Sequence, residues 1–312
     1  MSARPARPAD AAEPAAGFAF ALGAFLLWGL LPFYMKWVDH IAPWEVVAHR
    51  VVWSVPVAGV LLMLMRRTAD LKAALRDPKT LAQAALTAGL ISINWGVYVW
   101  AIAAERTVEA ALGYYINPLV NVVLATLFLG ERLTRLQALA IALAATAVAI
   151  LTFRAGGLPW VSLVLAFSFG LYGFLRKTLP VGAAQGFMLE VILLSPPALV
   201  IIGWMAMAGS GHFGPTGAAD IALLLLAGPV TAIPLILYAN GAKLLRYTTI
   251  GVMQYLTPTM IFLVAIFVFG EPFSVWQLVA FCFIWAALAL YTLSLFRTAR
   301  AARAAATAPP AH

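Results

Sequence analysis

The sequence predicts an all-α integral membrane protein of ten transmembrane helices, built as two inverted five-helix repeats. Three observations predict this fold: an apolar composition, ten long apolar runs, and a match of the chain to itself. Of the 312 residues, 63% are hydrophobic and only 10% are charged, and the mean hydropathy is +0.94. Soluble domains are about half apolar and about a quarter charged, because polar groups must cover their surface. The composition therefore excludes a cytosolic enzyme and a disordered protein.

The charged residues indicate a lipid bilayer as the surrounding medium. The formal net charge is +8, yet the basic residues stand in short gaps between apolar runs and form no basic domain. We therefore expect no nucleic-acid partner. Cys282 is the single cysteine and lies in an apolar run, and the four histidines are scattered. The sequence thus predicts no disulfide, no metal site and no cofactor.

Ten segments have the length of a membrane span, since a bilayer core of about 30 Å requires roughly 20 apolar residues. The first is too long for a signal peptide, and the bulky residues 34–37 follow it where a cleavage site needs small ones. The tails 1–16 and 297–312, rich in Ala, Pro and Arg, are predicted to be disordered. The predicted spans are 17–35, 44–65, 81–101, 108–129, 133–153, 158–178, 183–207, 219–242, 247–269 and 273–296.

The distribution of basic residues predicts the orientation of these spans. With a cytoplasmic N-terminus, sixteen of the twenty Lys and Arg residues fall on the cytoplasmic side. Lys36, Arg106 and Arg154 fall on the opposite side, and Arg50 lies within a span. Because cytoplasmic loops carry the excess of Lys and Arg, both termini are predicted to be cytoplasmic.

The chain also matches itself at an offset of 140 residues. The matching segments are Tyr115–Pro118 with Tyr255–Pro258, Gly130–Glu131 with Gly270–Glu271, and Arg50 with Glu190. The repeats cover 17–153 and 158–296, with five spans each. An odd number of spans forces the two halves into opposite orientations, which is the architecture of many secondary transporters.

Several segments resemble the EamA-like branch of the drug/metabolite transporter superfamily, and within it the RarD-type permeases. They are His49–Ser54, Asn94–Ala101, Leu112–Leu119, Gly130–Leu133 and Ala166–Gly173. The resemblance covers nearly the whole chain. It implies a permease of the bacterial inner membrane that exports small organic metabolites or drugs.

Two ionisable residues lie deep in predicted spans, where an uncompensated charge costs several kcal/mol. Glu190 is the only acidic residue well inside an apolar run, and Arg50 lies similarly deep in the second span. Each is a candidate either for substrate or proton coupling or for a structural ion pair, and the sequence leaves open whether they pair with each other. Their neighbour His49 is a weaker candidate for a proton carrier.

Polar and aromatic residues are concentrated in the third, fourth, eighth and ninth spans. Aromatic walls with a few amides suit a planar or amphipathic solute. The alternative is that these groups hydrogen-bond between helices or form the interfacial aromatic belt. The predicted substrate-binding residues are Asn94, Tyr98, Tyr114, Tyr115, Asn117, Tyr238, Gln254 and Tyr255.

Two prolines related by the repeat, Pro118 and Pro258, are candidate hinges, because proline removes a backbone donor and bends a helix. No catalytic or phosphate-binding motif occurs in the chain. The sequence therefore favours a secondary transporter of small organic solutes that works by alternating access. A channel or receptor, and a membrane-embedded enzyme, are the alternatives, and protons are a candidate coupling ion.

Overall fold

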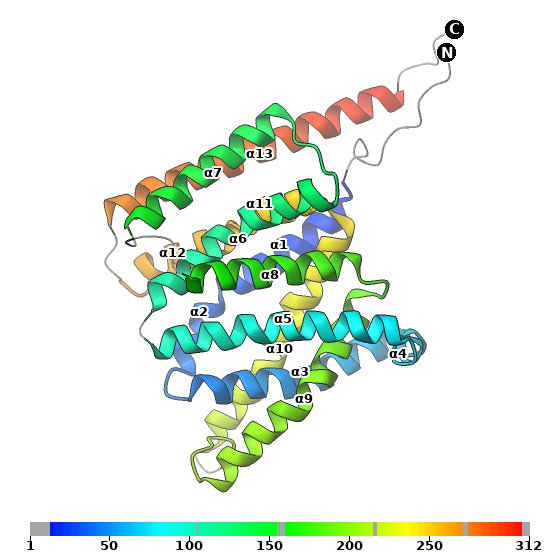
Figure 1. The fold of residues 1–312 in the computed structure, drawn as a ribbon, viewed down its shortest axis with the longest axis vertical. Coiled ribbons are helices and arrows are strands. Elements are labelled where there is room, and N and C mark those ends of the chain that lie inside the picture. The colour runs from blue at the N-terminus through cyan, green and yellow to red at the C-terminus, as the bar shows by residue number, and fades with distance from the viewer. Residues whose placement is uncertain are drawn as a thin grey trace.

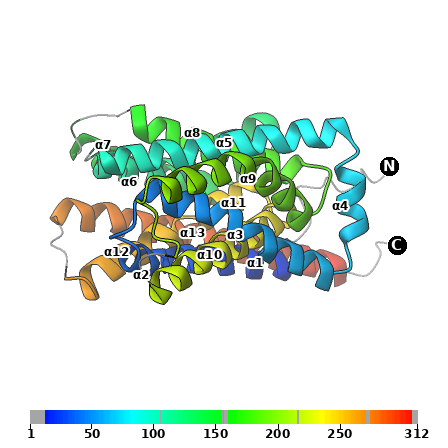
Figure 2. The same ribbon diagram turned by 90° about the horizontal axis from the view of Figure 1, so that it is seen from below.

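A computed structural model describes residues 13–104, 106–154, 156, 160–214, 217–270 and 274–307, and in these ranges the regular structure is entirely helical. The helices pack side by side into one elongated bundle (Figures 1 and 2). They are α1 (Ala15–Gly29), α2 (Leu31–Trp37), α3 (Pro43–Leu64), α4 (Thr68–Ala74), α5 (Pro78–Ala103), α6 (Thr107–Phe128), α7 (Arg135–Arg154), α8 (Trp160–Thr178), α9 (Ala183–Met207), α10 (Ala218–Leu244), α11 (Tyr247–Met253), α12 (Leu256–Phe267) and α13 (Val275–Thr307).

Eight segments of the described chain are long and apolar enough to cross a membrane. They correspond to the α1–α2 pair, α3, α5, α6, α7, α9, α10 and α13. Two of the ten predicted spans do not qualify. The span 158–178 corresponds to α8, which carries Arg176 and Lys177 in its last turn. The span 247–269 is divided into the short helices α11 and α12. The chain is a multi-pass membrane protein.

The helix boundaries differ from the predicted spans in three further places. The segment 17–35 is divided at Leu30, where α2 begins with Pro32 in its first turn, a position at which proline needs no hydrogen-bond donor. The polar gap 66–80 contains the short helix α4. The helix α13 continues to Thr307, into the segment predicted as a disordered tail, whereas residues 1–12 and 308–312 lie outside the described chain.

Helices from the two halves of the sequence pack against each other throughout the bundle. The most extensive pairs are α6 with α8, α7 with α13, α3 with α9, and α1 with α10. Glycines allow close approach at the contact of α1 with α10 and at that of α6 with α11. A Cβ atom at Gly241 of α10 would lie 3.0 Å from the backbone nitrogen of Ala21, and one at Gly251 of α11 would lie 2.9 Å from the carbonyl oxygen of Pro118. Small residues are the usual means by which membrane helices approach closely.

Candidate functional site

Arg50 of α3 is held between α5 and α10. Its Nε donates a hydrogen bond of 2.8 Å to the hydroxyl oxygen of Thr231 on α10, and its guanidinium carbon lies 4.9 Å from the ring centroid of Trp95 on α5. The Thr231 hydroxyl in turn donates to the carbonyl of Ala227 at 2.8 Å, which orients its oxygen as an acceptor for Arg50. Arg50 itself is only partly buried. These contacts hold the guanidinium group in place.

Three tyrosines lie within electrostatic range of this arginine. The phenol groups of Tyr34, Tyr98 and Tyr114 lie close enough to Arg50 for electrostatic interaction. The rings of Tyr98 and Tyr114 meet edge to face with their centroids 6.0 Å apart, and Tyr114 is 37% exposed. The Tyr34 hydroxyl is already engaged, because it donates to the carbonyl of Leu223. The structure therefore brings the predicted residues Arg50, Tyr98 and Tyr114 together at an accessible, aromatic-lined position.

Glu190 of α9 lies in a different, closed environment. Its Oε1 lies 3.4 Å from Nη1 of Arg176, and its Oε2 accepts a hydrogen bond of 3.1 Å from the hydroxyl of Tyr172. Glu190 is 1% exposed and Arg176 is fully buried. The sequence analysis assigned Arg176 to the cytoplasmic basic residues that orient the chain. The structure instead makes it the ionic partner of Glu190, and Arg50 does not occupy that place.

The predicted amide side chains are buried at contacts between helices. Asn94 donates to the carbonyl of Leu165 and to the hydroxyl of Ser168, both on α8. Asn117 donates to the carbonyl of Ala166 at 2.6 Å. Gln254, which follows α11, accepts a hydrogen bond of 2.9 Å from an amide of α6 that the sequence analysis did not single out. These bonds fasten α5, α6 and α8 to one another.

The amide that donates to Gln254 belongs to Asn121, which also lies 3.4 Å from the Oδ1 of Asn117. It stands one helical turn after Asn117, so the spacing of four residues was the signal that could have identified it.

The remaining predicted aromatic residues lie in the helix core. Tyr238 is fully buried against Phe25 and Trp28. The hydroxyl of Tyr255 donates to the backbone carbonyl of Tyr115, which stands 140 residues earlier, at 3.2 Å. The side chain of Tyr115 packs edge to face on Phe281.

The two predicted hinge prolines occupy different positions in their helices. Pro118 lies inside the continuous helix α6, whereas Pro258 stands in the first turn of α12, just after the break that separates it from α11. Proline is tolerated in a first turn, because the backbone nitrogen there has no intrahelical acceptor.

His49, the weaker proton-carrier candidate, is buried beside Arg50. Its Nδ1 accepts a hydrogen bond of 3.0 Å from Nε1 of Trp53, and its ring stacks on Phe213 with centroids 5.0 Å apart. Through these contacts, His49 packs between α3 and the loop that follows α9.

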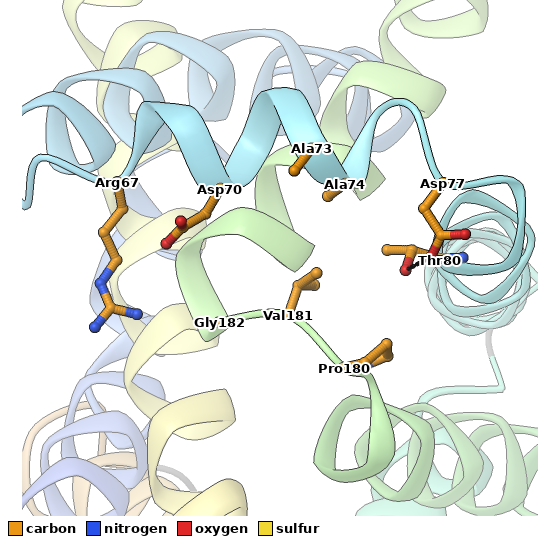
Figure 3. Close-up of a pocket in the computed structure, with 9 residues that line it drawn as sticks. All are labelled: Arg67, Asp70, Ala73, Ala74, Asp77, Thr80, Pro180, Val181 and Gly182. Carbon is orange, nitrogen blue, oxygen red and sulfur yellow. Dashed lines mark hydrogen bonds between the residues drawn. The ribbon is translucent and has the colours of Figure 1, made fainter.

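A polar pocket of about 480 Å³ lies at the end of the bundle near α4, and none of the predicted site residues lines it (Figure 3). Asp77 lines it and caps α5, with the hydroxyl and backbone nitrogen of Thr80 both donating to its carboxylate. The Thr80 hydroxyl bond lowers the pKa of Asp77. Asp70 accepts from the amide of Gln185. The acidic groups of this pocket thus serve the local fold.

Sequence reasoning missed a cluster of charged residues at the start of α11. Glu131, in the loop between α6 and α7, accepts hydrogen bonds from the backbone nitrogens of Tyr247 at 2.7 Å and Thr248 at 3.0 Å, and from the Thr248 hydroxyl. Glu13 accepts from the backbone nitrogen of Arg246 at 2.6 Å, and burial raises the pKa of Glu13. The paired Gly-Glu motif was the signal for Glu131, which the sequence analysis assigned only to a helix end.

Comparison with known proteins identifies the family. Residues 15–153 match the EamA-like transporter family. Protein RarD of Streptomyces exfoliatus is 39% identical over 292 residues, which are 94% of this chain and 93% of that protein. The chain belongs to the EamA-like transporter family. The uncharacterized transporter YojE of Bacillus subtilis is 42% identical over 94% of this EamA-like chain and 98% of its own length. Protein RarD of Escherichia coli is 38% identical over 93% of this chain and 98% of its own length.

A solved crystal structure shares the fold of this EamA-like protein. It superposes with a TM-score of 0.69 over 90% of this chain and 98% of the other, at 19% sequence identity. The resemblance predicted from the motifs is therefore confirmed. The protein is a multi-pass membrane transporter related to the RarD proteins.

Proposed function

We propose that this EamA-like protein is a secondary transporter that moves small organic metabolites or drugs across the bacterial inner membrane by alternating access. In this proposal ten spans form two inverted five-helix repeats, and both termini are cytoplasmic. The first repeat comprises α1–α2, α3, α5, α6 and α7. The second comprises α8, α9, α10, α11–α12 and α13.

The observation that carries the proposal is the symmetry of the helix contacts. Exchanging each span for its counterpart converts the α1–α10 contact into α8–α5, the α6–α8 contact into α12–α1, and the α3–α10 contact into α9–α5. All of these contacts exist, and α3–α9, α7–α13 and α6–α11 are each converted into themselves. Such a network supports a pseudo-two-fold relation between the halves, and rocking of one half against the other opens a shared central site to either side in turn.

The solute site in this proposal lies around Arg50, Tyr98 and Tyr114. These side chains are partly accessible, whereas Asn94, Asn117, Tyr238, Gln254 and Tyr255 are buried. We propose that the buried group, together with Tyr115, supports the walls of the site. Pro118 and Pro258 are the proposed positions at which the backbone bends between states.

The test is transport by purified protein in proteoliposomes. Vesicles loaded with a mixture of cytosolic metabolites and drugs are incubated, and the solutes inside and outside are quantified by mass spectrometry. We expect selective loss of a small set of solutes, accelerated by the same solute on the opposite side, because a carrier returns faster when loaded. Empty vesicles are the control. Loss without such acceleration indicates a channel, new chemical species indicate an enzyme, and no loss from vesicles that hold folded protein contradicts the proposal.

Proton coupling is tested in the same vesicles with an imposed pH gradient. If Glu190 carries the coupled proton, Glu190→Gln abolishes pH-driven movement and preserves exchange down a solute gradient. If the pH gradient drives solute movement equally well in Glu190→Gln, then Glu190 serves the ion pair alone.

A further inference from the structure

Building on the proposed function, we infer that Arg50 binds the anionic group of the transported solute, and that the solute is a small organic anion with a planar apolar body. The inference rests on the charge balance around Arg50, on the guanidinium donors that remain available, and on the aromatic side chains near it.

The charge of Arg50 has no acidic partner within ion-pair distance among the residues that the structure describes. Its electrostatic neighbours are the phenols of Tyr34, Tyr98 and Tyr114. Glu190, at the matching position of the other repeat, has Arg176 as its partner. An isolated charge at membrane depth costs several kcal/mol unless it is hydrated or paired. Glu190 is therefore already neutralised by a partner of opposite charge, whereas Arg50 can still pair with an anionic group.

The contacts of Arg50 also leave part of its guanidinium group available. Thr231 takes up Nε, and Trp95 lies against the group at 4.9 Å. Of the two arginines, only Arg176 has buried nitrogens that lack a hydrogen-bond partner among the described residues, at Nε and Nη1. A guanidinium group presents paired N–H donors that match the two oxygens of a carboxylate. Because Nε is occupied, the two Nη atoms provide the donors.

Three aromatic side chains form the neighbouring surface. Trp95 lies against Arg50, and Tyr98 and Tyr114 are partly exposed beside it. Aromatic side chains offer large flat surfaces, and a tyrosine hydroxyl adds a polar contact at one end. The arrangement fits a solute whose anionic group contacts Arg50 while its ring lies against the tyrosines.

Binding of matched probes to the purified full-length protein tests this inference. The probes are phenylacetate, phenylacetamide and phenethylamine, which share the ring and differ in the charge of the polar group. Binding is measured in detergent by isothermal titration calorimetry at pH 7. We expect phenylacetate to bind at least tenfold more tightly than phenylacetamide, and phenethylamine to bind more weakly than the amide.

Variants at the site assign the effect to the arginine. Arg50→Gln is expected to abolish the preference for the carboxylate, and Arg50→Lys to retain part of it, because the charge remains while the paired donors are lost. The matched control is Arg154→Gln, since Arg154 lies 4.1 Å above the ring of Trp276 and is exposed. This variant should bind phenylacetate as the wild type does. If Arg50→Gln does not fold, Thr231→Val, compared with Thr231→Ser, tests the same orientation of the guanidinium group.

Three results would overturn the inference. They are equal binding of the carboxylate and the amide, an unchanged preference in folded Arg50→Gln, and no binding of any probe by folded wild-type protein. Failure of the proposed function is recognised separately, because it leaves the metabolite mixture in the vesicles unchanged whatever the charge of its components.

Discussion

Two charged side chains, Arg50 and Glu190, stand 140 residues apart in the sequence and have different surroundings. Glu190 is enclosed with Arg176 and Tyr172, whereas Arg50 rests on Thr231 and Trp95 and stays partly accessible. A buried ion pair that loses one member leaves a charge without compensation, which costs about 3–5 kcal/mol. The ion pair of Glu190 with Arg176 therefore stabilises the fold, whereas Arg50 is the residue that we propose to contact a solute.

A double-mutant cycle tests the pairing of Glu190 with Arg176. We expect Glu190→Gln and Arg176→Gln each to lower the free energy of unfolding by about 3 kcal/mol, and the double variant to recover much of that loss. Reversible unfolding in detergent measures these changes. The control cycle combines Glu190→Gln with Arg50→Gln, whose effects should add, because the two side chains have different partners. Additive losses at positions 176 and 190 would contradict the pairing.

Gly173 of α8 provides a second test at the scale of a single residue. A Cβ atom at this position would collide with the hydroxyls of Tyr238 and Tyr247, which pack directly over it. We expect Gly173→Ala to destabilise the protein by about 1–3 kcal/mol, as overpacking of a core does. Gly96→Ala is the control, because no atom lies within 4 Å of a Cβ there, and alanine favours a helix by about 1 kcal/mol over glycine. Equal stability of the two variants would refute this description of the packing.

Among the elements, α11 depends most on a distant part of the chain. Its first backbone nitrogens are bound by Glu131 of the α6–α7 loop, and Glu13 binds the residue before it. The unpaired N–H groups of a helix start attract a carboxylate because they carry partial positive charge. The loop between α6 and α7 thereby fastens the first turn of a helix that lies more than 100 residues later in the sequence.

Removing that carboxylate should loosen α11. We expect Glu131→Ala to cost about 1–2 kcal/mol, the usual effect of losing a helix cap, and to speed hydrogen exchange at the backbone amides of Tyr247 and Thr248. Exchange is followed by mass spectrometry of the protein in detergent. Arg135→Ala, an exposed change at the start of α7, should leave exchange in α11 as it is. Unaltered exchange in Glu131→Ala would show that the cap does not hold this helix.

Over the whole molecule, the elements with predicted cytoplasmic ends lie on one side of the bundle. The helix α4 and the C-terminal end of α13 both lie on this side of the bundle, separated along its long axis (Figures 1 and 2). Glu13, Glu131 and the start of α11 are joined by hydrogen bonds. That this side is the cytoplasmic one is the prediction from the basic residues.

Single-cysteine labelling in intact cells tests the orientation, once Cys282 has been replaced. A membrane-impermeant reagent should modify Ser210→Cys, in the loop after α9, and should not modify Lys72→Cys on α4 or Arg300→Cys on α13. Permeabilised cells serve as the control, because all three positions are exposed and should then react. The reverse pattern would invert the whole topology.

The sequence by itself determined the membrane class, the family, the approximate position of each long helix and the identity of the two deep charges. These properties follow from composition and from short motifs, which need no knowledge of neighbouring helices. Only the tertiary structure decided that α1–α2 and α11–α12 are divided, because hydropathy averages over about 19 residues and does not detect a break in the backbone. It also decided that Arg176 pairs with Glu190 and that Glu131 caps α11. Such partners come from different helices, and the periodicity of one helix carries no information about which residue of another it meets.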